Sequence, residues 1–289
     1  MSVLIKGSYK EILESGDIIR RIFSQKKIRI DNRSYINKCL TSAHKLYDSW
    51  EKKDYGIIKN GTIFEILPHA LECHRIGTAL KWVEKKHGLE EKLKLILKGS
   101  IWPYDKFKKN KAKDTAFEVY TMARFEKVGL QPRFEEPDIV FKHGNMEFSI
   151  ACKFIHSERK LATNIKKAVR QIQNSGKLGI IALCIDEISP HKVIHNSAVH
   201  FDIYLNGIFG RFIEKYDTLL NRIIRPKEVI GLIMSYSTSI VIKDIDLPTF
   251  VEEWGVNPRC GSTSSGFANL YQVVKKLKSL EENKNASYI

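Results

Sequence analysis

The segment from Glu135 to Ile155 combines residue types and spacing that could perform chemistry. Its centre contains Gly144-Asn145, a pair that favours a two-residue hairpin turn. With that turn, Asp138 is predicted to lie directly opposite Ala151, and Lys153 to follow two residues later on the same face. A carboxylate beside a lysine suits phosphodiester hydrolysis, in which a metal ion lowers the pKa of the attacking water.

The metal that fits such a hairpin is Mg²⁺, with Mn²⁺ as a substitute, because hard cations bind carboxylates, carbonyl groups and water. Asp138 and the backbone carbonyl of Cys152 are the predicted ligands, and Lys153 would orient the water or stabilise developing charge. Ala151 stands where a second carboxylate is expected. The alternative is an amphipathic hairpin that has one solvated side and no chemical role.

The elements around this hairpin predict an α/β fold. A helical pattern, DTAFEVYTMARFEKVG, precedes it, and Glu118 lies there at the edge of the apolar residues. A second helical pattern, SERKLATNIKKAVRQIQNSG, comes after the hairpin and has its apolar stripe next to Gln171. Then come the apolar strand LGIIALCI, another helical stretch and the strand EVIGLIMSYSTSIVI.

These patterns divide the chain into three regions. Residues 1–105 are predicted to be mostly helical, residues 106–245 to form the α/β core, and residues 246–289 to be a less regular C-terminal extension. The basic stretch WPYDKFKKNKAKD is predicted to be a linker into the core.

The net charge of +15 indicates a polyanionic partner, of which nucleic acid is the commonest, although a lysine-rich surface is the alternative. The predicted phosphate contacts come from the basic stretch and from the helix after the hairpin: Lys108, Lys109, Lys166, Lys167 and Arg170.

The five cysteines are scattered without a CxxC pair, which fits a reducing cytoplasm better than a disulfide framework. The first residues lack a long apolar segment, and no run of 18 uninterrupted apolar residues predicts a membrane span. These features predict a cytoplasmic protein.

The segment from about 112 to 185 resembles the PD-(D/E)xK nuclease superfamily. Pro137-Asp138 matches the PD of its motif, and Ala151-Cys152-Lys153 takes the place of the acid-x-Lys triplet. Glu118 matches a helical glutamate that the family often carries, and Gln171 matches a polar residue of the following helix. The helix glutamate, PD hairpin, lysine strand, glutamine helix and apolar strand all occur in the family's order. The resemblance implies a restriction-endonuclease-like mixed sheet flanked by helices.

The activity implied by the resemblance is Mg²⁺-dependent hydrolysis of duplex DNA, with Asp138 and Glu118 at the metal and Lys153 at the attacking water. It further implies a restriction or phage-defence effector. No Walker P-loop is present, so an ATP-driven step would need a separate helicase or ATPase subunit. Cutting both strands would be easiest for a homodimer. An RNA or tRNA nuclease is a further alternative.

Ala151 departs from the family pattern, and three explanations stay open. The alanine is an engineered replacement of an acid that traps an inactive enzyme, or the acid has moved to Glu158 or Glu147. In the third explanation the chain is a natural pseudonuclease that binds DNA as a scaffold subunit. Each of them predicts weak or absent cleavage by the chain as written.

Overall fold

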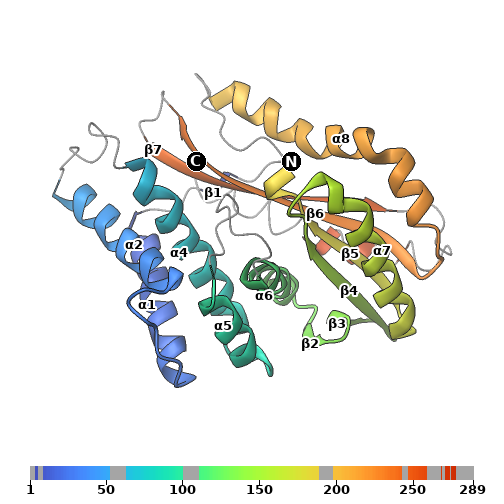
Figure 1. Ribbon diagram of the computed structural model, residues 1–289, viewed down its shortest axis with the longest axis horizontal. Helices are drawn as coiled ribbons and strands as arrows, with labels where there is room; N and C mark the ends of the chain where they lie inside the picture. Colours follow the sequence, from blue (N-terminus) through green and yellow to red (C-terminus); the bar gives the residue numbers. More distant parts are fainter. Residues whose placement is uncertain are drawn as a thin grey trace.

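The computed structural model describes residues 4–5, 9–52, 63–99, 111–188, 198–242 and 247–258, and short pieces at 268, 271–273 and 275–277. In these residues a group of N-terminal helices packs against a mixed sheet that has further helices on its other face (Figure 1). The predicted α/β class, with a mixed sheet flanked by helices and a helical N-terminal region, is confirmed. No described helix is both long and apolar enough to cross a membrane.

The N-terminal helices are α1 (Tyr9–Gln25), α2 (Tyr35–Glu51), α4 (Ile63–Val83) and α5 (Leu89–Leu97). Helices α1 and α2 pack against each other and against α4, and α4 and α5 pack against α6 (Lys111–Lys127). The apolar residues of these helices recur at three- and four-residue spacing, so each presents one buried side to this bundle.

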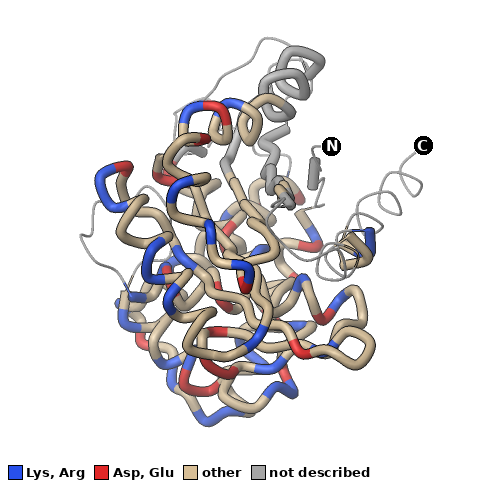
Figure 2. Tube along the Cα trace, turned by 90° about the vertical axis from the view of Figure 1, so that its right-hand side faces the viewer, with Lys and Arg blue, Asp and Glu red and all other residues tan. Residues whose placement is uncertain are grey.

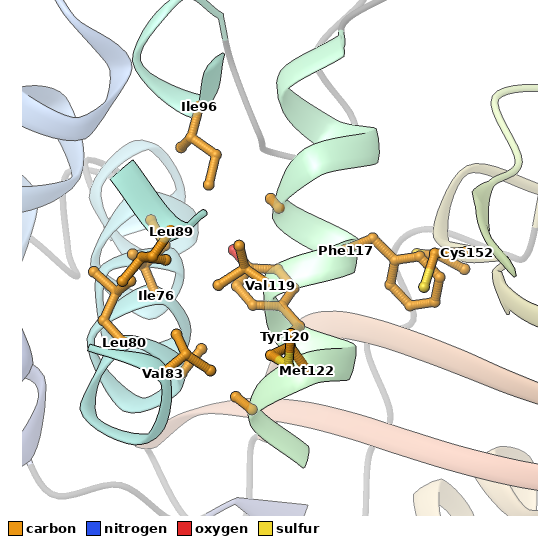
Figure 3. Packing of buried hydrophobic residues seen from close by; sticks show 14 of the residues in the cluster. Ile76, Leu80, Val83, Leu89, Ile96, Phe117, Val119, Tyr120, Met122 and Cys152 are labelled. Atoms are coloured by element: carbon orange, nitrogen blue, oxygen red, sulfur yellow. The ribbon is translucent and has the colours of Figure 1, made fainter. Parts of the chain in front are cut away.

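Helix α6 lies between the N-terminal helices and the sheet. Val119 and Met122 belong to the apolar cluster shared with α4 and α5, whereas Phe117 points toward Cys152 on the sheet (Figure 3). The helix therefore has little exposed surface in its central turns, and a polar residue such as Glu118 is held between two packed layers.

Within the described residues the sheet has seven strands in the order β1-β7-β6-β5-β4-β3-β2. Strands β4, β5 and β6 run parallel, and the other neighbouring pairs are antiparallel. The bounds are β1 (Leu4–Ile5), β2 (Arg133–Glu135), β3 (Asp138–His143), β4 (Met146–Phe154), β5 (Leu178–Cys184), β6 (Val229–Ile242) and β7 (Leu247–Pro258).

Two helices make the crossovers between the parallel strands: α7 (Glu158–Ser175) joins β4 to β5, and α8 (Ala198–Ile223) joins β5 to β6. A short 3₁₀ turn (Asp186–Ile188) comes after β5. Buried residues of α7 and α8 form a second apolar cluster on the face of the sheet opposite α6 (Figure 1). Both faces of the parallel strands are therefore covered, as parallel strands require.

The predicted hairpin register is confirmed where the two strands pair. Lys142 lies opposite Glu147 and Ile139 opposite Ile150, around a turn at Gly144-Asn145. The ladder ends at the Ile139–Ile150 pair, so the predicted pair of Asp138 and Ala151 is not part of it. Gly144 has a positive φ of 59°, which a residue without a β-carbon adopts without strain.

Strand β7 comes from the region predicted to be a C-terminal extension, and it pairs with β6 from Leu247 to Pro258. The two-residue strand β1, from the N-terminal region, pairs with β7 in turn. The sheet thus draws on residues outside the 106–245 core range. The sequence of β7, LPTFVEEWGVNP, hides the strand because its prolines, glycine and adjacent glutamates interrupt the alternation.

A buried polar network ties α4 to the end of β5 and to the middle of β6. Asp186 is fully buried and accepts hydrogen bonds from the N–H (2.8 Å) and hydroxyl (2.6 Å) of Ser237. Arg75 of α4 lies 3.7 Å from the same carboxylate and over the ring of Tyr120. Burial raises the pKa of Asp186, although Arg75 and Ser237 favour its charged form.

Replacing Ser237 with Ala is expected to lower the free energy of unfolding by about 2 kcal/mol, because a hydrogen bond to a buried carboxylate is lost. Ser235 is the matched control, since it is buried on the same strand and its hydroxyl has no hydrogen-bond partner among the described residues. Ser235→Ala should be neutral or slightly stabilising in chemical denaturation. Equal losses for the two variants would contradict the role given to Asp186.

Candidate active site

Asp138 begins β3 and meets the end of β4 through its side chain. Its Oδ2 accepts hydrogen bonds from the Cys152 N–H (2.7 Å) and from Lys153 Nζ (3.2 Å). Lys153 Nζ also donates to the Cys152 carbonyl oxygen at 2.7 Å. The side chains of Asp138 and Lys153 are only 14% and 16% exposed. The ion pair of Asp138 and Lys153 therefore holds β3 and β4 together just beyond the last pair of the ladder.

Glu118 approaches the same place from α6. It is 13% exposed and forms an ion pair with Lys92 of α5. Burial, and then the nearby charge of Asp138, raise the pKa of Glu118, while Lys92 and Lys153 oppose that change. Glu118 is therefore not a freely solvated carboxylate on the surface of α6.

The two carboxyl groups share one electrostatic environment. Burial raises the pKa of Asp138, even though Lys153 and the Cys152 N–H stabilise its charged form. A carboxyl group whose pKa is raised by burial and by the charge of another carboxylate favours a bound proton or cation. Such perturbed groups are common at functional sites, although structural ion pairs also produce them. We call Glu118, Asp138, Cys152 and Lys153 the α6–hairpin cluster.

The α6–hairpin cluster contains two carboxylates and one carbonyl group that could meet a metal ion. No group of three or more His, Cys, Asp or Glu side chains within the described ranges is arranged to hold a metal. Mg²⁺ is commonly bound through one or two carboxylates and keeps several waters. Asp138 and Glu118 fit this type of site, with the Cys152 carbonyl beside them. The Cys152 thiol does not contribute, because burial raises its pKa well above the ordinary value.

Ala151 does not join the α6–hairpin cluster. Its side chain is fully buried and belongs to the apolar cluster on the α7 side of the sheet, together with Ile155 and Ile165. Its neighbour on β5 is Ile181. The predicted polar side of the hairpin is therefore covered by a helix at this position, and a carboxylate placed there would meet aliphatic side chains.

The acids considered as replacements at this position are engaged elsewhere. Glu158 pairs with Lys215 of α8 at 2.8 Å, and Glu147 pairs with Arg133 of β2 at 2.8 Å. In the described structure the second carboxylate near Asp138 comes from α6 instead.

The remaining predicted site residues lie on α7 or outside the described residues. The predicted apolar stripe of α7 is buried, and Gln171 beside it has a buried Oε1 that has no hydrogen-bond partner in the described part of the chain. None of the hydrogen bonds that Asp138 and Lys153 form within the described residues involves Gln171, so Gln171 does not join the α6–hairpin cluster. The predicted phosphate contacts Lys166, Lys167 and Arg170 are exposed on α7. Lys108 and Lys109 lie outside the described residues.

A second charged cluster, which the sequence did not reveal, lies at the carboxyl ends of β4 and β5. His156 is placed between Asp114 (3.2 Å) and Glu187 (3.3 Å), and Glu187 also pairs with the buried Lys113. Asp114 precedes Glu118 by one helical turn, so both acids lie on one side of α6. Asp114, His156 and Glu187 come from three separate parts of the chain. The sequence could have suggested their contact only through the rule that the carboxyl ends of neighbouring parallel strands lie at the same edge of the sheet.

His156 should make stability depend on pH. Burial lowers its pKa, but the stronger combined effect of Asp114 and Glu187 raises it to about 9. A raised pKa stabilises the fold fully below the unfolded value of about 6.5, and this contribution disappears as the pH rises toward 9. The contribution is at most about 3 kcal/mol, and solvent around the 48% exposed Asp114 reduces it.

Denaturation curves of the parent protein should therefore show falling stability between about pH 6.5 and pH 9. His156→Gln should flatten this dependence. An unchanged slope in that variant would assign the pH dependence to another group.

Comparisons of the chain with protein-family models, with curated proteins and with solved structures found no match. Any function assigned to the chain therefore rests on the contacts of its described residues and on the sequence motif.

Proposed function

We propose that this protein is a metal-dependent endonuclease that hydrolyses phosphodiester bonds in DNA. The contact of Asp138 with Lys153 carries the proposal, because it brings a partly desolvated carboxylate and a lysine together at the end of the hairpin. Glu118 of α6 is a second partly desolvated carboxylate, and its pKa responds to the charges of both residues. The order of helix, hairpin, helix and strand, on which the sequence resemblance rests, supports the proposal.

In this proposal Asp138 and Glu118 bind Mg²⁺, which would supply charge neutralisation and an activated water. Lys153 already lies within 3.2 Å of Asp138, so its ammonium group is placed to hold a water or a phosphate oxygen beside the metal ligands. Lys92 balances the charge of Glu118. Ala151 supplies no ligand, so turnover should be slow. The restriction or phage-defence role rests on the resemblance alone.

A second candidate function is nucleic-acid binding without cleavage. The burial of Ala151 among aliphatic residues favours it, because that environment accepts no carboxylate without rearrangement. In this case the α6–hairpin cluster would be a retained structural ion-pair group.

The deciding experiment is a cleavage assay with plasmid, linear duplex, single-stranded DNA and RNA, each with Mg²⁺, with Mn²⁺ and with a chelator. Metal-dependent cutting of DNA is the expected result. Preferential cutting of RNA would change the substrate class. Salt-sensitive DNA binding with no cutting in any condition would favour the non-catalytic candidate.

A further inference from the structure

A groove of about 680 Å³ lies in the N-terminal helical region. It runs along one side of α2 and is bounded by the start of α4 and the end of α5, elements that lie together on one side of the molecule (Figure 1). Its described lining residues are separate from the α6–hairpin cluster. The volume is in the range of ligand-binding pockets.

The lining residues of α2 follow the helical repeat. Ser34, Lys38, Ser42 and Lys45 recur at intervals of three or four residues, so they form one continuous stripe. At about 1.5 Å per residue, the stripe from Ser34 to Lys45 is about 16 Å long. The groove is therefore an elongated trough suited to an extended ligand.

The charge of the groove is strongly unbalanced. Its basic lining residues are Arg33, Lys38, Lys45 and Lys98, and Glu65 is the one acidic residue in its described lining. The four basic residues are exposed, and none forms an ion pair with another described residue.

Other cations in this part of the chain have acidic partners: Lys92 pairs with Glu118, Lys86 with Glu126 and Arg21 with Glu84. Figure 2 shows basic and acidic positions interspersed along much of the trace. The groove thus differs from the general surface in its excess of basic over acidic side chains, and a bound anion would relieve the repulsion among its cations.

The remaining lining groups suit a phosphate backbone. Hydroxyl groups of Thr41 and Ser42 lie between the two lysines of α2, and Ile66 and Leu97 add apolar surface. The groove also includes the first turn of α2, where the helix dipole favours negative charge. A trough of about 16 Å is long enough to contact several successive phosphates of one strand.

We propose that this groove binds the phosphodiester backbone of a nucleic acid and forms a second contact surface apart from the α6–hairpin cluster. The proposal deepens the proposed function, on which it rests for the identity of the polyanion, but it does not require cleavage. Lysines at the groove hold the strand without reading its sequence.

The test measures binding of labelled duplex and single-stranded DNA by fluorescence anisotropy, with a chelator present so that no cleavage occurs. Lys38→Gln with Lys45→Gln removes two groove charges. Lys10→Gln with Lys81→Gln is the matched control, because these lysines are exposed on α1 and α4 outside the groove. Thermal unfolding of each variant checks that the fold is retained.

The groove variant should bind DNA about tenfold more weakly at moderate salt. Its plot of log affinity against log salt should be flatter by about 1.8, since each lost phosphate contact contributes about 0.9. The control pair should match the parent protein. Equal salt slopes for the two double variants would overturn the proposal. So would a groove variant that keeps its DNA affinity but loses binding of a mononucleotide, which would identify a nucleotide pocket.

Cleavage assays of the parent protein and of both lysine double variants separate this proposal from the proposed nuclease activity. Anisotropy in the chelator reports binding alone, whereas cleavage with Mg²⁺ reports the α6–hairpin cluster, whose residues do not line the groove. A protein that never cuts but loses affinity in the groove variant would refute the nuclease and support the groove. If both lysine double variants cut DNA normally and have equal salt slopes, the result would support the nuclease and refute the groove.

Discussion

Replacing Asp138 with Asn is expected to reduce metal-dependent cleavage by a factor of about 10² to 10⁴. A metal ion supplies several kcal/mol of transition-state stabilisation, and each 1.36 kcal/mol corresponds to a factor of about ten. The substitution preserves the shape of the side chain and one oxygen that can accept from the Cys152 N–H, so the end of the hairpin should stay closed. Single-turnover cleavage of a duplex measures the effect.

The same variant should be more stable than the parent protein at pH 7. Burial raises the pKa of Asp138, so its ionised form is disfavoured in the folded state. A group with a raised pKa supports the fold fully below its unfolded pKa of about 3.9 and loses that support as the pH rises through the folded value. The stability gain of Asp138→Asn should therefore be largest at neutral pH and fade below about pH 3.9. Gain in stability with loss of activity is typical of functional sites.

Metal binding gives a readout that does not depend on turnover. At a concentration about 100 times the dissociation constant, Mg²⁺ or Mn²⁺ should stabilise the parent protein by about 2.7 kcal/mol. Asp138→Asn should lose this stabilisation, and Glu147→Gln is the control because it lies on the same hairpin, half-exposed and paired with Arg133. Equal metal stabilisation in parent and Asp138→Asn proteins would remove Asp138 from the metal site.

The hairpin shows what local sequence determines. The turn at Gly144-Asn145 sets the register, and the register sets which residues face each other, so the Lys142–Glu147 pair could be predicted from the sequence. The contact of Asp138 with Lys153 could be predicted in the same way. Local patterns also located α7, whose apolar stripe is buried as predicted.

Alternation along a strand assigns side chains to faces, but it does not say what covers each face. Ala151 is predicted on the same face as Lys153, yet α7 packs over this face and buries Ala151 and its neighbour Ser149. Only Lys153, near the end of β4, reaches the polar environment of Asp138. Position along the strand, not face alone, decides which of these residues lies in the cluster.

Contacts between distant segments are beyond the reach of sequence patterns. Lys92 and Glu118 come from different helices, and no pattern in either helix predicts that they pair. The burial of Glu118 depends on α6 being enclosed by α5 and the sheet together (Figure 3). The same reason applies to His156, whose partners lie on α6 and after β5.

The meaning of Ala151 is open to a direct test with Ala151→Glu. The larger side chain would have to fit between the sheet and α7, where overpacking alone costs about 1 to 3 kcal/mol. Its charge would also be buried among aliphatic groups such as Ile155 and Ile165. We expect the free energy of unfolding at pH 8 to fall by about 3 to 5 kcal/mol, and metal-dependent cleavage not to increase.

Ala151→Gln separates size from charge, because it has nearly the same volume and no ionisable group. The introduced carboxyl group should have a raised pKa in this apolar setting, so its ionisation destabilises the fold as the pH rises. The Glu and Gln variants should therefore be about equally stable near pH 4, and the Glu variant clearly less stable at pH 8. The opposite result is equally informative. A Glu variant as stable as the Gln variant at pH 8, and faster in Mg²⁺-dependent cleavage than the parent, would mean that position 151 reaches the metal. The alanine would then be a replaced ligand of this site, and the packing against α7 would have to open to admit it.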